Sequence, residues 1–294
     1  MKVDLPDDKY VVAVSGGVDS VMLLDLLSHE PKLELIVAHF DHGIRPDSAK
    51  DRRFVERLAK KYGLPFVYGE GKLGAKASEA VARKARYDFL RKVQKERHAE
   101  AIITAHHQDD MLETAILNLL RGTHRRGLSS LRSTKDIKRP LLDFPKAELI
   151  TYAKTHHLDW REDSTNSDEI YLRNYIRRQI LPKFSSTDRH RFLEILGSAK
   201  YTNEAADGIV ARMLKTQSAY TLDRLWFEQL PHAVAKDIMI AWLNQAGVQG
   251  IDRKLLETLV IAAKTLSAGK QRDINTIYIL EIKEKTLALV TRDR

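Results

Sequence analysis

Six consecutive residues near the N-terminus, Ser15-Gly16-Gly17-Val18-Asp19-Ser20, combine two glycines, two hydroxyls and a carboxylate. Glycine at 16 and 17 permits backbone angles that let successive N–H groups point at one anion. A helix that starts near Asp19 would add the positive end of its dipole, and the Asp19 carboxylate could hold Mg²⁺ against phosphate oxygens. The alternative is an ordinary strand–helix turn capped by Asp19 or Ser20. The whole hexapeptide favours a phosphate-binding loop, although it lacks the Gly-Lys-Ser/Thr of a Walker A loop.

Imidazoles and carboxylates gather in two further stretches, 39–42 and 106–113. In the second stretch Asp110 and Glu113 are i, i+3 neighbours, so both carboxylates lie on one side of the first turn of a predicted helix. Such a pair, close to His106, suits a pocket that binds an ammonium group and deprotonates it. Acidic residues are also favoured in any first helical turn, where they complement the helix dipole.

Alternating strand and helix patterns must position these residues. Apolar, β-branched segments that predict strands are each followed by a segment with helical spacing of apolar residues. This alternation predicts an α/β fold with a Rossmann-like, doubly wound parallel sheet, in which ligands bind beyond the carboxyl ends of the strands. The chemistry-bearing residues follow the first, second and fourth strands, so we expect them at one edge of the sheet. The expected strands are 9–14, 33–39, 65–68 and 101–105, and the expected helices are 19–28, 47–62, 78–94 and 109–120.

The pattern changes beyond Pro182, where helices predominate. We therefore predict a catalytic domain, a linking helix and a smaller, mainly helical C-terminal domain that ends in a hairpin. Their bounds are 1–185, 186–215 and 216–294. The expected elements of this part are helices over 188–216, 223–245 and 252–265 and strands over 275–282 and 286–291.

The 294-residue chain has 49 Lys and Arg against 40 Asp and Glu, a formal net charge of +9, and no cysteine. A basic balance of this size favours a polyanionic partner, with nucleic acid ahead of membrane. The lack of cysteine excludes disulfides and thiolate chemistry. No apolar run approaches the roughly 18 residues of a membrane helix, and the first eight residues do not resemble a signal peptide. The expected location is therefore the cytoplasm, with no membrane partner.

Basic residues are concentrated in two segments where RNA could lie. Clusters of this kind set affinity through phosphate contacts and leave base recognition to other residues. The first basic cluster (121–127) contains Arg121, His124, Arg125 and Arg126, and the second (173–191) contains Arg173, Arg177, Arg178, Lys183, Arg189 and Arg191.

The hexapeptide Ser15–Ser20 resembles the loop of the N-type ATP pyrophosphatases, the PP-loop superfamily. These enzymes cleave ATP to AMP and pyrophosphate while they adenylate an acceptor. Within the superfamily the chain resembles the tRNA(Ile)-lysidine synthase family, in family order, over most of residues 10–185. The matching stretches are "HFDHGIRPDSAKD" (39–51), "SEAVARKARYDFL" (78–90), "AHHQDDMLETAILNLLRGT" (105–123), "GLSSL" (127–131), "RPLLDFPKAELITYA" (139–153) and "WREDSTNSDEIYLRNYIR" (160–177). The C-terminal third is a weaker match, consistent with the first C-terminal domain of the family, so the resemblance implies that 216–294 contacts tRNA. A second C-terminal domain is not expected.

This resemblance implies a carbon–nitrogen ligase that acts on the wobble cytidine, position 34, of a tRNA(Ile) with a CAU anticodon. ATP adenylates the C2 oxygen of that cytidine and releases pyrophosphate. The side-chain amine of L-lysine then displaces AMP to give lysidine, which changes codon reading from AUG to AUA. ATP is thus the implied substrate, Mg²⁺ the implied ion, and the resemblance also allows a homodimer.

Residue roles follow from the motifs and the resemblance together. Arg83 and His106 would support the phosphates, although the residues alone, without the resemblance, favour a solvated helix face formed by Arg83, Lys84 and Arg86. The predicted catalytic set is Asp19, Arg83, His106, Asp110 and Glu113. The predicted ATP-binding residues are Ser15, Gly16, Gly17, Val18, Asp19 and Ser20, with Asp19 holding Mg²⁺ through the phosphates. Lysine would bind Asp110 and Glu113, and the tRNA backbone would contact Arg121, Arg125, Arg126, Arg173, Arg177 and Arg178.

Three other functions compete with this interpretation. A two-metal phosphoesterase could use the histidines and aspartates as metal ligands, but it would leave Ser15–Ser20 and 160–177 without a role. A catalytically inactive RNA-binding module fits the charge but not the acids of the pocket. The tRNA thiolases of the same superfamily are disfavoured because they need cysteines. The ligands open to a phosphoesterase are His39, Asp41, His42, His106, His107, Asp109 and Asp110.

Overall fold

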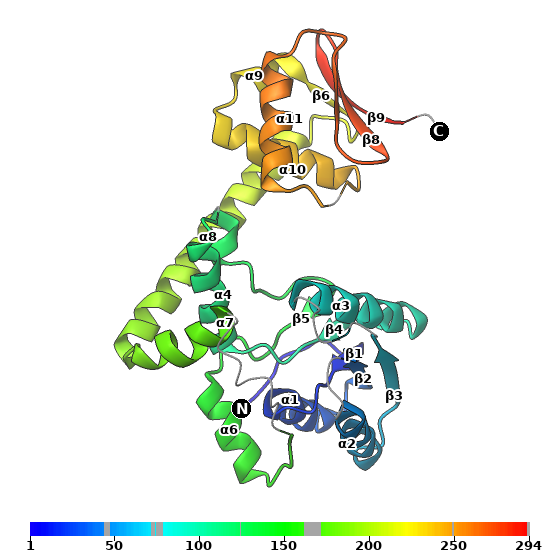
Figure 1. Ribbon diagram of the computed structural model, residues 1–294, viewed down its shortest axis with the longest axis vertical. Coiled ribbons are helices and arrows are strands. Elements are labelled where there is room, and N and C mark those ends of the chain that lie inside the picture. The colour runs from blue at the N-terminus through cyan, green and yellow to red at the C-terminus, as the bar shows by residue number, and fades with distance from the viewer. Residues whose placement is uncertain are drawn as a thin grey trace. The chain divides into compact units, whose positions relative to one another are not determined.

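The computed structural model describes residues 1–43, 48–71, 74, 79–123, 125–161, 172–248 and 250–292. The chain divides into two compact units, Met1–Lys200 and Tyr201–Arg294. The long helix α8 (Ser186–Leu214) runs through this division (Figure 1).

The first unit is built on a five-stranded parallel sheet with strand order β3-β2-β1-β4-β5. In its register Val11 pairs with Ile36 on one side and with Ile102 on the other. The chain therefore winds outward in both directions from β1, as predicted, which places the topological switch point, where ligands bind in such folds, between β1 and β4. The strands are β1 (Lys9–Ala13), β2 (Glu34–Asp41), β3 (Phe66–Glu70), β4 (Ala101–Ile103) and β5 (Ile137–Lys138).

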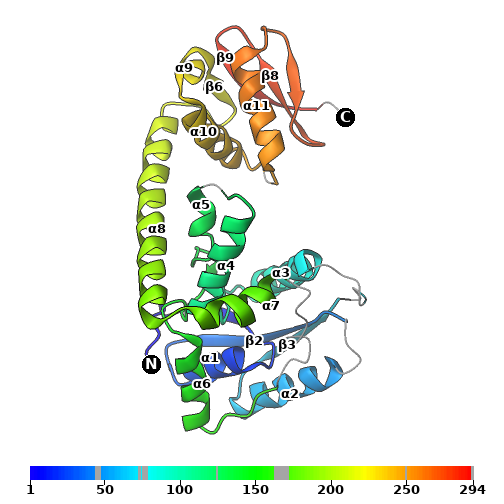
Figure 2. The same ribbon diagram turned by 60° about the vertical axis from the view of Figure 1, so that its left-hand side comes forward.

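Helices cover both faces of this sheet, which explains why its central strands are continuously apolar. Val12, Val37 and Ile103 face α1, α2 and α6, whereas the neighbouring residues Val11 and Ile36 face α3 (Figure 2). Residues that face one side of the sheet alternate along each strand with residues that face the other side, because successive side chains point in opposite directions. These helices are α1 (Val18–Ser28), α2 (Ser48–Lys61), α3 (Glu79–Glu96) and α6 (Lys146–Thr155).

A separate apolar cluster fixes the segment that follows the sheet. Leu112 and Ala115 of α4 pack against Ile176, Leu181 and α8. This packing brings the second basic cluster to the helix that carries Asp110 and Glu113. The elements concerned are α4 (Gln108–Leu120), α5 (Arg125–Leu128), α7 (Leu172–Tyr175), the π-helical turn η2 (Ile176–Ile180) and the 3₁₀ turn η3 (Leu181–Lys183).

The second unit packs the C-terminal end of α8 and the helices that follow it against an antiparallel sheet of order β6-β9-β8-β7. The predicted C-terminal hairpin is present as β8 and β9, although two further short strands extend it. The single helix expected over 223–245 is wrong, since the chain breaks at Pro231, which cannot donate a backbone N–H and disfavours helix before it. The elements are β6 (Thr221–Asp223), α9 (Arg224–Gln229), α10 (His232–Gln245), α11 (Arg253–Thr265), β7 (Gln271–Asp273), β8 (Tyr278–Ile282) and β9 (Thr286–Thr291).

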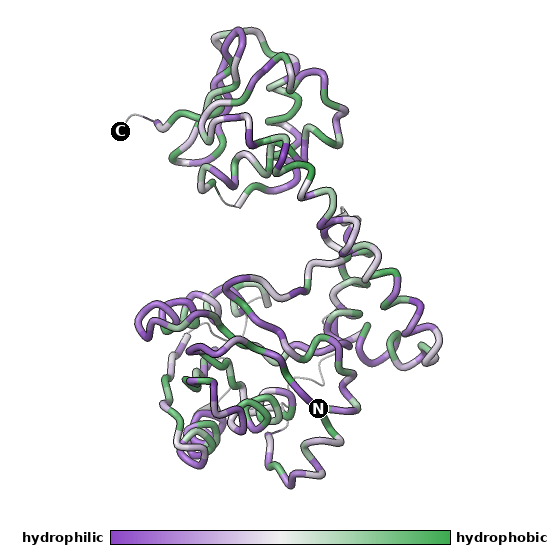
Figure 3. Tube along the Cα trace, turned by 180° about the vertical axis from the view of Figure 1, so that it is seen from behind, coloured by the Kyte–Doolittle hydropathy of each residue, from purple (hydrophilic) through white to green (hydrophobic). Residues whose placement is uncertain are grey.

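Hydropathy alternates over short stretches along both units (Figure 3). Across the part of the chain that the structure describes, no helix combines the length and apolar character needed to cross a membrane.

Candidate active site

The loop between β1 and α1 concentrates hydrogen-bond donors. Gly16 has a φ of +98°, an angle that side chains rarely tolerate, so the chain can turn sharply here. The N–H groups of Ser15 and Gly16 both donate to Ser20 Oγ at 3.2 Å, and the Gly17 N–H donates to Ser15 Oγ at 3.4 Å. Helix α1 then starts without a side-chain cap, which leaves its first N–H groups open to an anion. This loop, Ser15–Ser20, is called the phosphate loop below.

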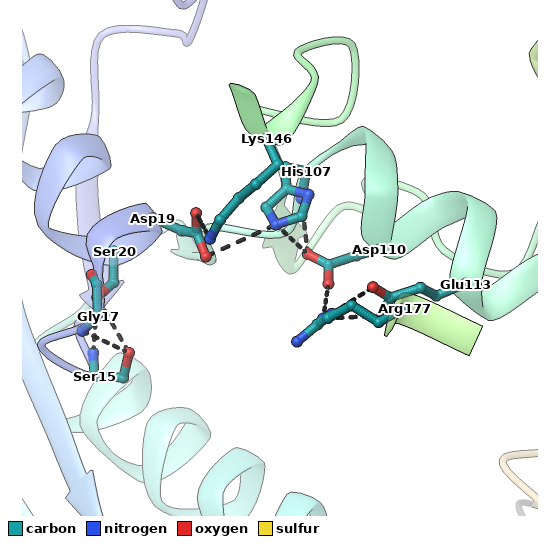
Figure 4. A network of polar contacts seen from close by, with 9 residues as sticks. All are labelled: Ser15, Gly17, Asp19, Ser20, His107, Asp110, Glu113, Lys146 and Arg177. Carbon is teal, nitrogen blue, oxygen red and sulfur yellow. Dashed lines mark hydrogen bonds and ion pairs between the residues drawn. The ribbon is translucent and has the colours of Figure 1, made fainter. Parts of the chain in front are cut away.

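Asp19 links the phosphate loop to residues far away in the sequence. Its Oδ1 accepts a hydrogen bond of 2.5 Å from the Nζ of Lys146, which is the first residue of α6. Its Oδ2 lies 3.7 Å from His107 Nε2, which is in turn 3.5 Å from Asp110 Oδ2 (Figure 4). A chain of polar contacts therefore runs from the phosphate loop to α4. Lys146 is not among the predicted site residues, although the matching stretch 139–153 contains it.

Asp110 and Glu113, called the carboxylate pair below, hold a guanidinium group. Arg177 Nε donates to Glu113 Oε1 at 2.5 Å, and Arg177 Nη2 donates to Glu113 Oε2 at 2.9 Å and to Asp110 Oδ1 at 3.1 Å (Figure 4). The Glu113 side chain is 1% exposed, whereas the Arg177 side chain is 40% exposed. The structure thus brings the two predicted lysine-binding residues together, and shows that the pair accepts a planar cation.

The two carboxyl groups are in different electrostatic environments. Burial raises the pKa of Glu113 above its usual value, although hydrogen bonds from Arg177 partly oppose this. Burial acts in the same direction on Asp110, but His107, His106 and Arg177 outweigh it, and the pKa of Asp110 is lowered. Burial also opposes the charge of Arg177, yet Glu113 and Asp110 raise its pKa. Of the pair, Glu113 is therefore the better proton acceptor near neutral pH.

His106 is held as a neutral imidazole beside a group of arginines. Its Nδ1 lies 2.8 Å from Thr104 Oγ1. Burial lowers the pKa of His106 to about 3, against the opposing effect of Asp110 and with help from nearby arginines that include Arg83. Arg83 itself lies on α3 with its Cζ 4.9 Å from the centre of the Tyr87 ring. Both predicted phosphate supports thus belong to the carboxyl edge of the sheet.

Both basic clusters contain exposed and partly buried arginines. Arg121 and Arg178 are exposed, and Arg126 and Arg173 are partly buried. Arg189 is engaged, since it donates to Asp109 Oδ1 and to the Leu181 carbonyl at 3.2 Å each. His124 and the Arg125 side chain lie outside the described residues.

The histidines and acids of the phosphoesterase alternative have protein partners instead. His39 Nδ1 donates to the Val14 carbonyl at 2.8 Å, and Asp41 Oδ1 accepts from the Gly43 N–H at 2.8 Å. Within the described ranges, no three His, Asp or Glu side chains are grouped so that they could hold a metal ion.

Comparison with known proteins shows which family the chain is similar to. Residues 1–184 match the family described as PP-loop domain. A tRNA(Ile)-lysidine synthase of Thermus thermophilus is 44% identical over 60% of this chain and 36% of its own length. One of Actinobacillus pleuropneumoniae is 32% identical over 82% of this chain and 59% of its own length. The chain therefore spans less than two thirds of these relatives.

A solved structure shows the same fold. The U34-tRNA thiolase NcsA from Methanococcus maripaludis, determined with its [4Fe-4S] cluster, superposes with a TM-score of 0.59 at 18% identity. The match covers 68% of this chain and 74% of that chain. With the phosphate loop at the end of β1, the doubly wound sheet and the match over residues 1–184, the chain belongs to the PP-loop domain family.

Proposed function

We propose that this chain ligates L-lysine to C2 of the wobble cytidine, position 34, of a tRNA(Ile) with a CAU anticodon. ATP adenylates the cytidine with release of pyrophosphate, and lysine then displaces AMP. One observation carries the proposal: a continuous set of polar contacts joins the phosphate loop to the carboxylate pair through Asp19 and His107. The similarity to tRNA(Ile)-lysidine synthases supports the choice of substrate.

For adenylation, the phosphate loop and the N-terminus of α1 bind the phosphates of ATP. Asp19 offers one carboxylate as an oxygen ligand for Mg²⁺, and the uncapped N–H groups of the same turn would bind phosphate oxygens, so the residues fit an ion held mainly by the phosphates. When bound, this ion neutralises charge on the phosphates. Lys146 adds a cation at the same place, and neutral His106 has one ring N–H to donate.

For lysine transfer, the substrate ammonium takes the place of the Arg177 guanidinium on the carboxylate pair. Arg177 is partly exposed and belongs to the second basic cluster, so a tRNA phosphate can draw it away. A free lysine amine has a pKa of ~10.4, and at neutral pH only about one molecule in two thousand is nucleophilic, a penalty of roughly 4.6 kcal/mol. Glu113, whose pKa is raised, accepts the proton as the amine attacks C2.

For tRNA binding, both basic clusters contact the backbone, through Arg121, Arg125, Arg126, Arg173, Arg177 and Arg178. We place the reaction in the cytoplasm, and a homodimer is compatible with it.

Mass analysis of tRNA tests this function. The chain is incubated with tRNA(Ile), ATP and Mg²⁺, and with lysine, ornithine or arginine in separate reactions. We expect one lysine added at the wobble cytidine, with pyrophosphate and AMP formed in equal amounts, and no product on a tRNA whose wobble base is not cytidine. Release of inorganic phosphate without pyrophosphate would instead indicate a phosphoesterase.

A further inference from the structure

Three arginines surround a buried tyrosine at the carboxyl edge of β4 and β5. Arg83 and Arg86 lie on α3, with their Cζ atoms 4.9 Å and 5.4 Å from the centre of the Tyr87 ring. Arg139 follows β5 directly and is 8% exposed. All three act on the charge of His106, so they gather within electrostatic range of one point.

The centre of this arginine cluster contains unsatisfied polar atoms. Arg139 Nη1 donates to the Arg132 carbonyl, but Arg139 Nε is buried without a hydrogen-bond partner. The hydroxyl of Tyr87 is also buried with no partner in hydrogen-bond geometry, although it lies close enough to the Arg139 guanidinium to favour its charged form. Both atoms can donate a hydrogen bond, and buried donors are rarely left unpaired in folded proteins unless a ligand, ion or water completes them.

The charges of Arg83 and Arg139 are also unbalanced. Among the described residues, no carboxylate forms an ion pair with Arg83 or Arg139. Burial lowers the pKa of Arg139, the Tyr87 phenol opposes this effect, and the neighbouring charge of Arg83 lowers it further. Gathered guanidinium groups repel one another in a medium of low dielectric constant, so this arrangement is stabilised when an anion enters it.

We propose that Arg83, Arg86, Arg139 and the Tyr87 hydroxyl form a binding site for one phosphate group. Guanidinium groups match the paired oxygens of phosphate, and a tetrahedral phosphate has enough oxygens to serve several guanidinium groups and a phenol together. The site lies after β5 and on α3, whereas the phosphate loop follows β1. For Arg83 this site deepens the proposed function. It also gives a role to Arg86, Tyr87 and Arg139, to which the proposed function assigned none.

Two sources of phosphate reach this edge of the sheet: the diphosphate end of ATP and the backbone of RNA. The identity of the source rests on the proposed function, whereas phosphate binding itself needs no turnover. Equilibrium titrations of the full chain with pyrophosphate, with ATP and with a CAU anticodon stem-loop RNA, at equal ionic strength, therefore test the site separately from the reaction.

The key variants are Arg139→Gln, which removes the buried charge, and Tyr87→Phe, which removes only the hydroxyl. We expect Arg139→Gln to weaken at least one probe about tenfold, in line with the loss of a charge-assisted hydrogen bond, and Tyr87→Phe to weaken the same probe less. An effect on pyrophosphate and ATP identifies ATP as the source, and an effect on the stem-loop alone identifies RNA.

Lys84→Gln is the matched control, because Lys84 lies on the same helix, is exposed and pairs with Asp88 at 2.6 Å. It should leave every affinity within about twofold. Arg83→Gln, at a less buried position, repeats the test if Arg139→Gln does not fold. Unchanged affinity for all three probes in a folded Arg139→Gln or Arg83→Gln variant would overturn the proposal, even if the wild-type chain adds lysine to tRNA.

Discussion

Asp19 contacts both Lys146 and His107, so it stands between the phosphate loop and α4. We expect Asp19→Ala to abolish tRNA-dependent formation of AMP and pyrophosphate, because the proposed Mg²⁺ ligand is lost. The Asp19 side chain is 28% exposed in a surface turn, so the fold should survive. Thin-layer analysis of labelled ATP measures the products, and circular dichroism checks folding. Full activity of the folded variant would remove Asp19 from the reaction.

The carboxylate pair predicts a division of labour between its members. We expect Glu113→Gln to spare pyrophosphate release but to stall lysine transfer, so that adenylated tRNA accumulates, since the amide cannot accept a proton. Asp110→Asn should mainly raise the lysine concentration needed. Rapid-quench analysis with labelled ATP follows both steps. If Glu113→Gln instead blocked adenylation and left the lysine dependence unchanged, the pair would belong to ATP binding.

His106 predicts a pH dependence of stability. Its folded pKa is lowered to about 3 from an ordinary value of 6.5, so its contribution to stability is fully present above pH 6.5 and is lost as the pH falls. Between about pH 7.5 and about pH 5.5 the loss amounts to about 1 kcal/mol. Urea unfolding of His106→Gln should show a smaller loss than wild type over this range. His190→Gln, at a histidine that is 75% exposed, is the control and should follow wild type.

At the scale of single residues, the sequence identified which side chains belong to the site better than it identified the residues that they contact. The i, i+3 spacing of Asp110 and Glu113 was sufficient to place both carboxylates together, because a helix fixes that geometry locally. Arg177 lies at least 64 residues further along the chain, and it reaches the pair only because η2 packs on α4. Sequence spacing alone does not indicate this contact. Lys146 and Arg139 were missed for the same reason, since only the assembled sheet brings α6 and β5 to the phosphate loop and α3.

At the scale of elements, the first basic cluster predicts a salt effect. Each phosphate contact adds roughly 0.7–0.9 to the slope of log affinity against log salt concentration. Replacing Arg125 and Arg126 by Gln should therefore lower the slope for tRNA by roughly 1.4–1.8 if each arginine makes one phosphate contact, and leave ATP binding unchanged. Filter binding over a salt series measures the slope. The matched control replaces Lys60 and Lys61, in the last turn of α2, by Gln and should leave the slope unchanged. An unchanged slope in the arginine variant as well would mean that the first basic cluster is only a solvated surface.

The elements themselves were predictable where their pattern was long. The first four strands and their helices occur within a few residues of the expected bounds, because continuous apolar strands and helical apolar spacing are local signals. Strand β5 was missed because its two residues are too few to show a period, and it exists only by pairing with β4. The π-helical turn η2 likewise depends on packing against α4 rather than on its own residues.

At the scale of the whole molecule, the two units have separate apolar cores. The core of Met1–Lys200 is centred on the parallel sheet, and that of Tyr201–Arg294 on α10, with Trp242 fully buried at its middle. Trp242 Nε1 also donates to the Ser218 carbonyl at 3.0 Å. Because the phosphate loop and the carboxylate pair both belong to the first unit, damage to the second core should leave ATP binding intact.

Trp242→Ala tests this separation. Removing a buried tryptophan costs about 3–5 kcal/mol, so we expect the second unit to unfold at a lower temperature while the first keeps its own transition. Calorimetry should then resolve two transitions, and ATP affinity should stay within about twofold. We expect tRNA affinity to fall, because the second unit contains the C-terminal domain that we expect to contact tRNA. The matched change in the first core is Leu23→Ala on α1. It should lower the unfolding temperature of the first unit and weaken ATP binding, since Leu23 is fully buried one turn from the phosphate loop. A single transition, with ATP and tRNA binding lost together in Trp242→Ala, would show that the two cores fold as one.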